Sequence, residues 1–113
     1  MIVDVELHPS VSKSSKHTQP FLVIQNDVGN AHSSVTIVAA IVPRDGVEVS
    51  EVHVEIRPSQ SGLAADSVIL CDQLLSLNQE KIVRMIQTVD SEVMASVNAA
   101  LKISLGLDVD ADE

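Results

Sequence analysis

Aromatic side chains are almost absent from this 113-residue chain, which has one Phe and neither Trp nor Tyr. Proteins that hold single-stranded nucleic acid by stacking bases on aromatic rings need several such side chains, so this binding mode is nearly excluded. The core must instead be aliphatic, since hydrophobic residues still make up 45% of the chain. At this length and composition we expect one folded domain rather than a disordered chain.

Cysteine is scarce as well. The single Cys71 excludes an intrachain disulfide and a cysteine zinc cluster, which is typical of a protein in a reducing compartment. His8 and His32 have no ligand neighbours at metal spacing, so we expect no metal and no cofactor. Asp4 and Glu6 stand where a signal peptide would carry basic and then apolar residues, and no hydrophobic run is long enough for a membrane helix. We therefore expect a cytoplasmic protein without membrane contact.

Basic residues are few, seven against sixteen acidic ones, which gives a formal charge of −9. Tight nonspecific binding to a polyanion rests on phosphate neutralisation, so this charge argues against it. Four of the acids lie within residues 108–113. We expect these residues to form a solvated acidic tail after a domain of residues 1–107.

The hydrophobic pattern predicts short strands first and one long helix at the end. Strands are expected over residues 2–7, 21–24, 35–42, 47–56, 67–70 and 85–89, loops over 10–18 and 58–65, and a short helix over 79–84. Asp90 is a good N-cap, and apolar residues recur at intervals of three and four from Val93 to Leu105, before Gly106. The expected fold class is α+β, mostly β: a small antiparallel barrel with a C-terminal amphipathic helix.

Several linked segments make the chain recognisable. They are PFLVIQND at 20–27, TIVAAI at 36–41, VHVEI at 52–56, DSVIL at 66–70 and AALKISLGL at 99–107. In this order and spacing they resemble the MazF and PemK family of bacterial toxins, the mRNA interferases of toxin–antitoxin systems. The resemblance covers about residues 2–107 and implies an SH3-like barrel of the MazF/CcdB type that forms a homodimer. It also implies an antitoxin peptide as partner and metal-independent cleavage of single-stranded RNA, in which the ribose 2′-hydroxyl attacks the adjacent phosphate.

Two positions depart from the chemistry that the resemblance implies. In the family, an Arg before the Pro of the second strand and a Thr or Ser at the end of the third move the proton and stabilise the developing charge. The matching positions here are Gln19 and Val42. Gln exchanges no proton near neutral pH, and Val lacks the hydroxyl. His17, two residues before Gln19, is a candidate replacement base, against the alternative of a solvated loop side chain.

Candidates for nucleic-acid binding are three cations and four polar residues. They are Lys13, Lys16, Arg44, Asn26, His53, Ser67 and Gln73. For the last three, a hydrogen-bonded structural role or a dimer contact is an equally good alternative. Three functions therefore remain open: an endoribonuclease toxin with doubtful cleavage, a catalytically silent protein that binds RNA, an antitoxin or a sister toxin, and a gyrase poison like the CcdB toxins. The order and wording of the segments favour the first two.

Overall fold

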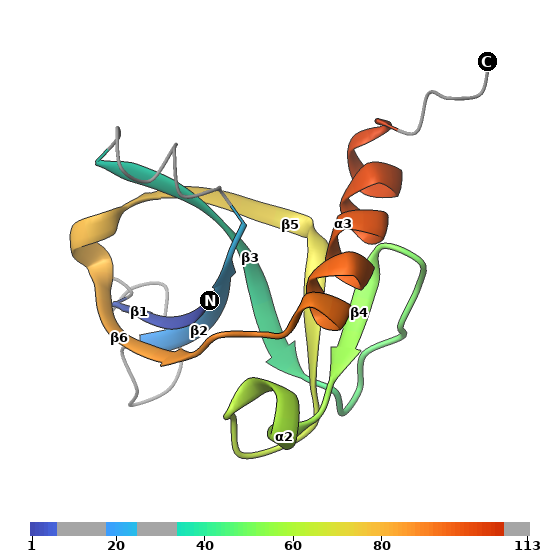
Figure 1. Ribbon diagram of the computed structural model, residues 1–113, viewed down its shortest axis with the longest axis horizontal. Coiled ribbons are helices and arrows are strands. Elements are labelled where there is room, and N and C mark those ends of the chain that lie inside the picture. The colour runs from blue at the N-terminus through green and yellow to red at the C-terminus, as the bar shows by residue number, and fades with distance from the viewer. Residues whose placement is uncertain (7–17, 25–33, 108–113) are drawn as a thin grey trace.

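The structure is a computed structural model that describes residues 1–6, 18–24 and 34–107. Figure 1 shows a strongly curled sheet, with helix α3 at one side of the curl and the short helix α2 beside it. The elements are β1 (Ile2–Glu6), β2 (Thr18–Val23), β3 (Val35–Pro43), β4 (His53–Ile56), α2 (Pro58–Ser61), β5 (Ser67–Asn78), a 3₁₀ turn (Gln79–Lys81), β6 (Ile82–Gln87) and α3 (Ser91–Leu105). The expected fold class, a mostly β antiparallel architecture with a C-terminal helix, is confirmed.

The six strands form one sheet in the order β4-β5-β3-β2-β1-β6, and every pair is antiparallel. The 12-residue β5 joins the two parts of the sheet, because its first part pairs with both β3 and β4 and its second part with β3 alone. Leu70 pairs with Ala40 and Leu74 with Ala39, so residues 71–73 are extra on β5. Such a bulge bends a strand and redirects its side chains.

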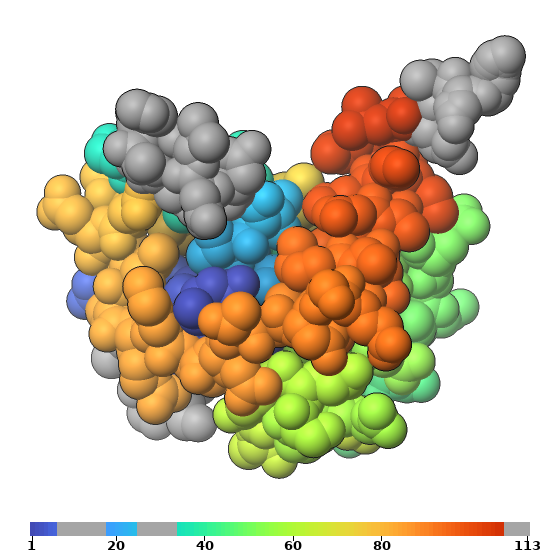
Figure 2. Space-filling model, viewed as in Figure 1, coloured from blue at the N-terminus to red at the C-terminus, as the bar shows by residue number. Residues whose placement is uncertain are grey.

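Alternation along the strands gives the sheet two apolar faces. The helix face consists of Ile2, Leu22, Ala39, Ile41, Ile56, Ile69 and Cys71, which pack with Val89 and with Val93, Val97 and Ala100 of α3. The Gln19 face, named after the polar residue of β2 that lies on it, consists of Val3, Val5, Phe21, Val38, Ala40, Val68 and Leu70, with Val47 and Val49 packed against them. Figure 2 shows α3 packed tightly against its neighbouring elements.

Helix α3 follows the sequence prediction closely. The Asp90 side chain caps it by accepting a hydrogen bond from the Val93 N–H at 2.9 Å. Gly106 ends it in the left-handed region, with φ of 68°. Val93 and Val97 are buried, as the apolar spacing predicts. Among the described residues, no helix is long and apolar enough to span a membrane.

The prediction of one strand over residues 47–56 is wrong, because only the last four of these residues, which form β4, are in a strand. Ser50 and His53 form a turn in which the His53 N–H donates to the Ser50 carbonyl at 3.1 Å. Val47 and Val49 are half-buried because this segment folds over the Gln19 face. The alternating pattern therefore reflects packing of an irregular segment rather than pairing in a ladder.

Residues 58–65, expected as a loop, begin with the single helical turn α2. Pro58 starts it, since a helix loses no hydrogen bond when Pro occupies its first position. Gly62 ends it with φ of 75°, and a Cβ there would lie 2.8 Å from Gln87 Oε1. The Gln87 side-chain amide also donates to the Gln60 carbonyl at 2.9 Å. Thus α2 packs against the end of β6 through these contacts of Gln87.

The stretch after the bulge also differs from expectation. The strand expected over 67–70 continues to Asn78, and the helix expected over 79–84 is only a 3₁₀ turn. Asn78 does cap that turn, because its side chain accepts from the Glu80 N–H at 2.8 Å. The last strand is β6, earlier than the expected 85–89. Short apolar runs do not determine by themselves where a strand begins and ends.

Candidate functional site

The strand register places the two substituted family positions on one face of the sheet. Strand β2 pairs with β3 through Phe21 and Ala40. The pairing of β2 with β3 ends there, and two residues further along each strand Gln19 and Val42 point to the same face as Phe21 and Ala40. Both side chains are half-buried. The two positions that the resemblance singles out therefore lie on one face of the sheet, on adjacent strands.

They belong to a transverse row on the Gln19 face. The row consists of two paired parts, Val5 with Gln19 on β1 and β2, and Val42, Val68 and Glu55 on β3, β5 and β4. The next row is paired throughout and runs through Val3, Phe21, Ala40, Leu70 and His53. Neighbouring strands lie about 4.8 Å apart, so the backbones at Val42 and Glu55 are about 10 Å apart. The polar side chains of Gln19, Glu55 and His53 thus share this face with an apolar cluster.

The centre of the row offers little acid–base chemistry. Val42 packs against the apolar cluster of the Gln19 face and has no polar side-chain atom. Gln19 has an amide that donates and accepts hydrogen bonds, but it carries no charge and does not titrate. These two side chains can contact a ligand without moving its protons.

Arg44 lies two residues beyond Val42 and forms an ion pair with Glu55. Its Nε donates to Glu55 Oε2 at 2.6 Å, and its Nη1 donates to the Val47 carbonyl at 3.2 Å. Both partners of the ion pair are about half exposed, with side-chain exposures of 44% and 56%. The cation that follows Val42 most closely along the chain is therefore already paired with a carboxylate.

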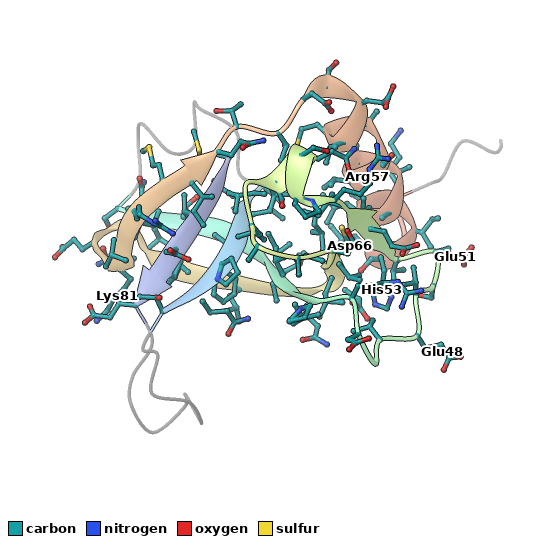
Figure 3. The ribbon with its side chains drawn as sticks, turned by 90° about the horizontal axis from the view of Figure 1, so that it is seen from below. Glu48, Glu51, His53, Arg57, Asp66 and Lys81 are labelled. Carbon is teal, nitrogen blue, oxygen red and sulfur yellow. The ribbon has the colours of Figure 1, made fainter. Side chains whose placement is uncertain are left out.

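His53 is fixed through both ring nitrogens. Its Nδ1 accepts from the Ser50 backbone N–H at 3.0 Å, so the neutral ring carries its proton on Nε2. This Nε2 lies 3.2 Å from Asp72 Oδ1. In Figure 3, His53 lies at the same end of the molecule as Glu48 and Glu51, in acidic surroundings. The His53 side chain therefore connects the turn before β4 with the bulge of β5 through these two contacts.

The two remaining candidates for nucleic-acid binding in the described residues, Ser67 and Gln73, do not lie together. Ser67 is buried on the helix face, where its hydroxyl donates to the Ala65 carbonyl at 3.0 Å. Gln73 is exposed in the β5 bulge, beside Asp72. The register therefore places Ser67 on the opposite face from Gln19, in a position that suits a structural role.

Cys71 is fully buried on the helix face. Burial, and then the neighbouring Asp72 carboxylate, raise the pKa of its thiol to about 11. A thiol that stays protonated is a poor nucleophile, so Cys71 acts as a small apolar core residue.

The other residues singled out from the sequence belong to parts of the chain that the structure does not describe. Lys13, Lys16, His17 and Asn26, with the acidic tail at 108–113, lie outside the described residues. Within residues 1–6, 18–24 and 34–107, no group of three or more His, Cys, Asp or Glu side chains could hold a metal ion.

Sequence reasoning missed two residues, Glu55 as the partner of Arg44 and Asp72 as the partner of His53. Within one strand, alternation would also put Ser50 and His53 on opposite faces, which hides their contact. The only signal for these pairs in the sequence was that a basic side chain attracts an acidic one. That signal does not indicate which of the several acidic residues nearby is the partner.

Two solved structures illustrate the likeness of the fold. The Mycobacterium tuberculosis toxin MazF-mt6 matches with a TM-score of 0.78 at 20% identity, over 95% of this chain and 97% of that one. An endoribonuclease in complex with its cognate antitoxin, from a mycobacterial species, matches with a TM-score of 0.76 at 19% identity, over 94% and 91%. The architecture is thus that of the MazF-type toxins.

Sequence comparison identifies the family. The family described as "PemK-like, MazF-like toxin of type II toxin-antitoxin system" matches residues 1–105. Endoribonuclease EndoA of Bacillus subtilis is 39% identical over 102 residues, which cover 90% of this chain and 88% of that protein. Endoribonuclease MazF of Staphylococcus saprophyticus is 37% identical over 90% and 85%. The chain belongs to the PemK-like, MazF-like toxin family.

Proposed function

We propose that this protein is the toxin-family member of a type II toxin–antitoxin system, in which it binds an antitoxin peptide and, weakly, single-stranded RNA as a homodimer. RNA cleavage is absent or far below that of a relative with Arg and Thr at the two family positions. One observation carries the proposal: Gln19 and Val42 stand where the resemblance expects Arg and Thr, and alternation along β2 and β3 puts both on one face of the sheet.

The chemistry explains the expected loss of cleavage. Attack of a 2′-hydroxyl on phosphate needs a group that moves the proton and donors that stabilise the developing negative charge. General acid–base help contributes about 10²–10⁴ in rate, and one lost donor to such a charge costs about 3–4 kcal/mol. Gln19 and Val42 provide neither a titrating group nor a cation at this point.

Weak RNA binding follows from the charges of the described surface. Two of its cations are already paired, Arg44 with Glu55 at 2.6 Å and Arg84 with Asp4 at 2.9 Å. Affinity for RNA grows with the number of phosphates that a protein neutralises. A chain with formal charge −9, in which two of the described cations are held by carboxylates, should bind a short RNA only at low salt.

Exposed apolar side chains support a dimer. They lie at the start of β3, in the second part of β5, on β6, and at and just after the end of α3: Val35, Ile37, Leu75, Val83, Met85, Ile103, Leu105 and Leu107. Exposed apolar side chains on a small domain commonly contribute to an interface between proteins. Light scattering should give twice the 12.1 kDa mass of one chain, and a monomer at micromolar concentration would contradict the dimer.

The antitoxin partner follows from family membership and from the complex seen in the mycobacterial relative. Coexpression of this chain with the small protein encoded beside its gene tests this part directly. Copurification of a stable complex is expected. A neighbouring product that shows no binding, or the absence of a neighbouring small reading frame, would oppose the assignment.

Cleavage is tested on a long mixed-sequence RNA with a chelator present, by counting new 5′-hydroxyl ends. The unmodified protein should give none, or far fewer than EndoA measured beside it. His17→Ala and the matched His8→Ala variant complete the set. Robust cleavage by the unmodified chain would contradict the proposal, and its loss in His17→Ala alone would identify His17 as a replacement base.

A further inference from the structure

We propose that Glu55 competes with RNA phosphates for Arg44 and so keeps the RNA affinity of the Gln19 face low; this rests on the RNA binding proposed above. The competition concerns one guanidinium and two kinds of anion. A carboxylate and a phosphate both bind a guanidinium through its N–H groups, so each displaces the other from the same atoms.

The contacts of Arg44 show what a phosphate would have to displace. Its backbone is fixed in the turn after β3, because its N–H donates to the Asp66 carbonyl at 2.9 Å and its carbonyl accepts from the Val47 N–H at 3.2 Å. Its side chain is held at Nε by Glu55 and at Nη1 by the Val47 carbonyl. The Nη2 group has no partner among the described residues. The guanidinium is therefore held in place, with part of its donor set committed to a carboxylate.

The position of the pair connects it to the candidate site. Glu55 lies in the same transverse row as Gln19 and Val42. A phosphate that approaches this row meets the Glu55 carboxylate beside the guanidinium. The pair is half exposed, so water screens the attraction within it, and a phosphate can displace the carboxylate. The carboxylate charge stays nearby and opposes the phosphate even then.

Other acids nearby provide the matched control. Glu48 and Glu51 lie in the segment before β4, at the same end of the molecule as His53 (Figure 3), and both are exposed. Neither forms an ion pair with Arg44 in the described part of the chain. Glu48→Gln removes the same unit of charge as Glu55→Gln, without touching the guanidinium. The two variants therefore separate competition at Arg44 from a general change of net charge.

The experiment measures binding of a short fluorescent single-stranded RNA to the full chain, at several salt concentrations. We expect Glu55→Gln to raise affinity by about 3- to 10-fold and to steepen the slope of log K against log salt by up to about 0.7, the value for one more neutralised phosphate of a single strand. Glu48→Gln should change affinity by less than about twofold. Arg44→Gln should weaken binding, and in that background Glu55→Gln should have no more effect than Glu48→Gln.

Three outcomes would overturn the inference. Weaker binding by Glu55→Gln would mean that the carboxylate orients Arg44 for RNA rather than competing with it. Equal gains in RNA affinity for Glu55→Gln and Glu48→Gln would mean that the change in net charge alone causes the effect. A gain in affinity for Glu55→Gln that persists in the Arg44→Gln background would mean that Arg44 is not involved. If neither the unmodified chain nor Glu55→Gln binds RNA at any salt, the proposed RNA binding itself fails, which is distinguishable from the other three results.

Discussion

The two faces of the same sheet differ in what they carry. The core of the helix face is mostly aliphatic, and α3 covers it with Val93, Val97 and Ala100. The Gln19 face has an apolar cluster as well, but its rows include Gln19, Glu55 and His53. Because a one-residue step along a strand moves a side chain from one face to the other, adjacent residues serve different purposes. Stability depends most on the first face, and ligand chemistry on the second.

This difference separates the two positions of the proposed site from the packing that holds the fold. Gln19 and Val42 are half-buried on the Gln19 face, away from the contact between α3 and the sheet. We therefore expect substitutions at these two positions to leave the packing under α3 unchanged. The predictions below test that separation of the two faces.

The largest effect on stability is expected for Ile69→Ala, which opens a cavity on the helix face. Ile69 is fully buried, and truncating such a residue costs about 2–5 kcal/mol of unfolding free energy. The control is Val83→Ala on β6, where the side chain is 54% exposed and the change should stay within about 0.5 kcal/mol. Chemical denaturation measures both. A loss below about 1 kcal/mol for Ile69→Ala would show that the helix face is not the main source of stability.

A second effect appears only at high pH and also belongs to the helix face. Burial and Asp72 raise the pKa of Cys71 to about 11, whereas the thiol of the unfolded chain titrates near 9.0. Between these values the unfolded chain has lost the proton and the folded chain has not, so stability falls as pH rises from about 9 to 11. The loss is at most about 3 kcal/mol.

The comparison is made against Cys71→Ala, which has no thiol to titrate. The stability difference between the two proteins should be constant below about pH 8.5 and should shift against the unmodified chain above pH 9. Parallel pH profiles up to pH 11 would contradict a thiol held neutral by its surroundings.

The smallest effect on stability is expected on the Gln19 face. Gln19→Arg combined with Val42→Thr should change the unfolding free energy by less than about 1 kcal/mol, because both side chains are only half-buried. The measurement is again chemical denaturation. A loss comparable to that of Ile69→Ala would mean that the two faces do not differ in the way described above.

Most of the fold could be predicted from sequence, for reasons visible in single residues. The N-cap Asp90, the terminal Gly106 and the apolar spacing between them define α3, since these signals are local. The course of residues 47–56 could not be predicted, because alternation also arises when Val47 and Val49 pack from an irregular segment. Tertiary contacts decide such cases, and one sequence does not contain them directly.

The candidate site could be predicted only in part. The resemblance pointed to Gln19 and Val42, and alternation along β2 and β3 puts both on the face of Phe21 and Ala40. The contacts of Arg44 with Glu55 and of His53 with Asp72 depend on which strands lie side by side, so spacing along the chain gave no indication of them. For Ser67, the pattern of a buried strand was correct, but the face it occupies depends on register.

The measurement that tests the central claim most directly is RNA cleavage by the Gln19→Arg and Val42→Thr variants, singly and together, with a chelator present and 5′-hydroxyl ends counted. If the fold is intact and only the chemistry is missing, the double variant should gain cleavage well above the unmodified chain. Each single variant should recover less than the pair, because groups that act on one transition state are not additive. A folded double variant that still fails to cleave would contradict the claim that the missing chemistry at these two positions accounts for the lack of cleavage, and would favour a catalytically silent binding protein.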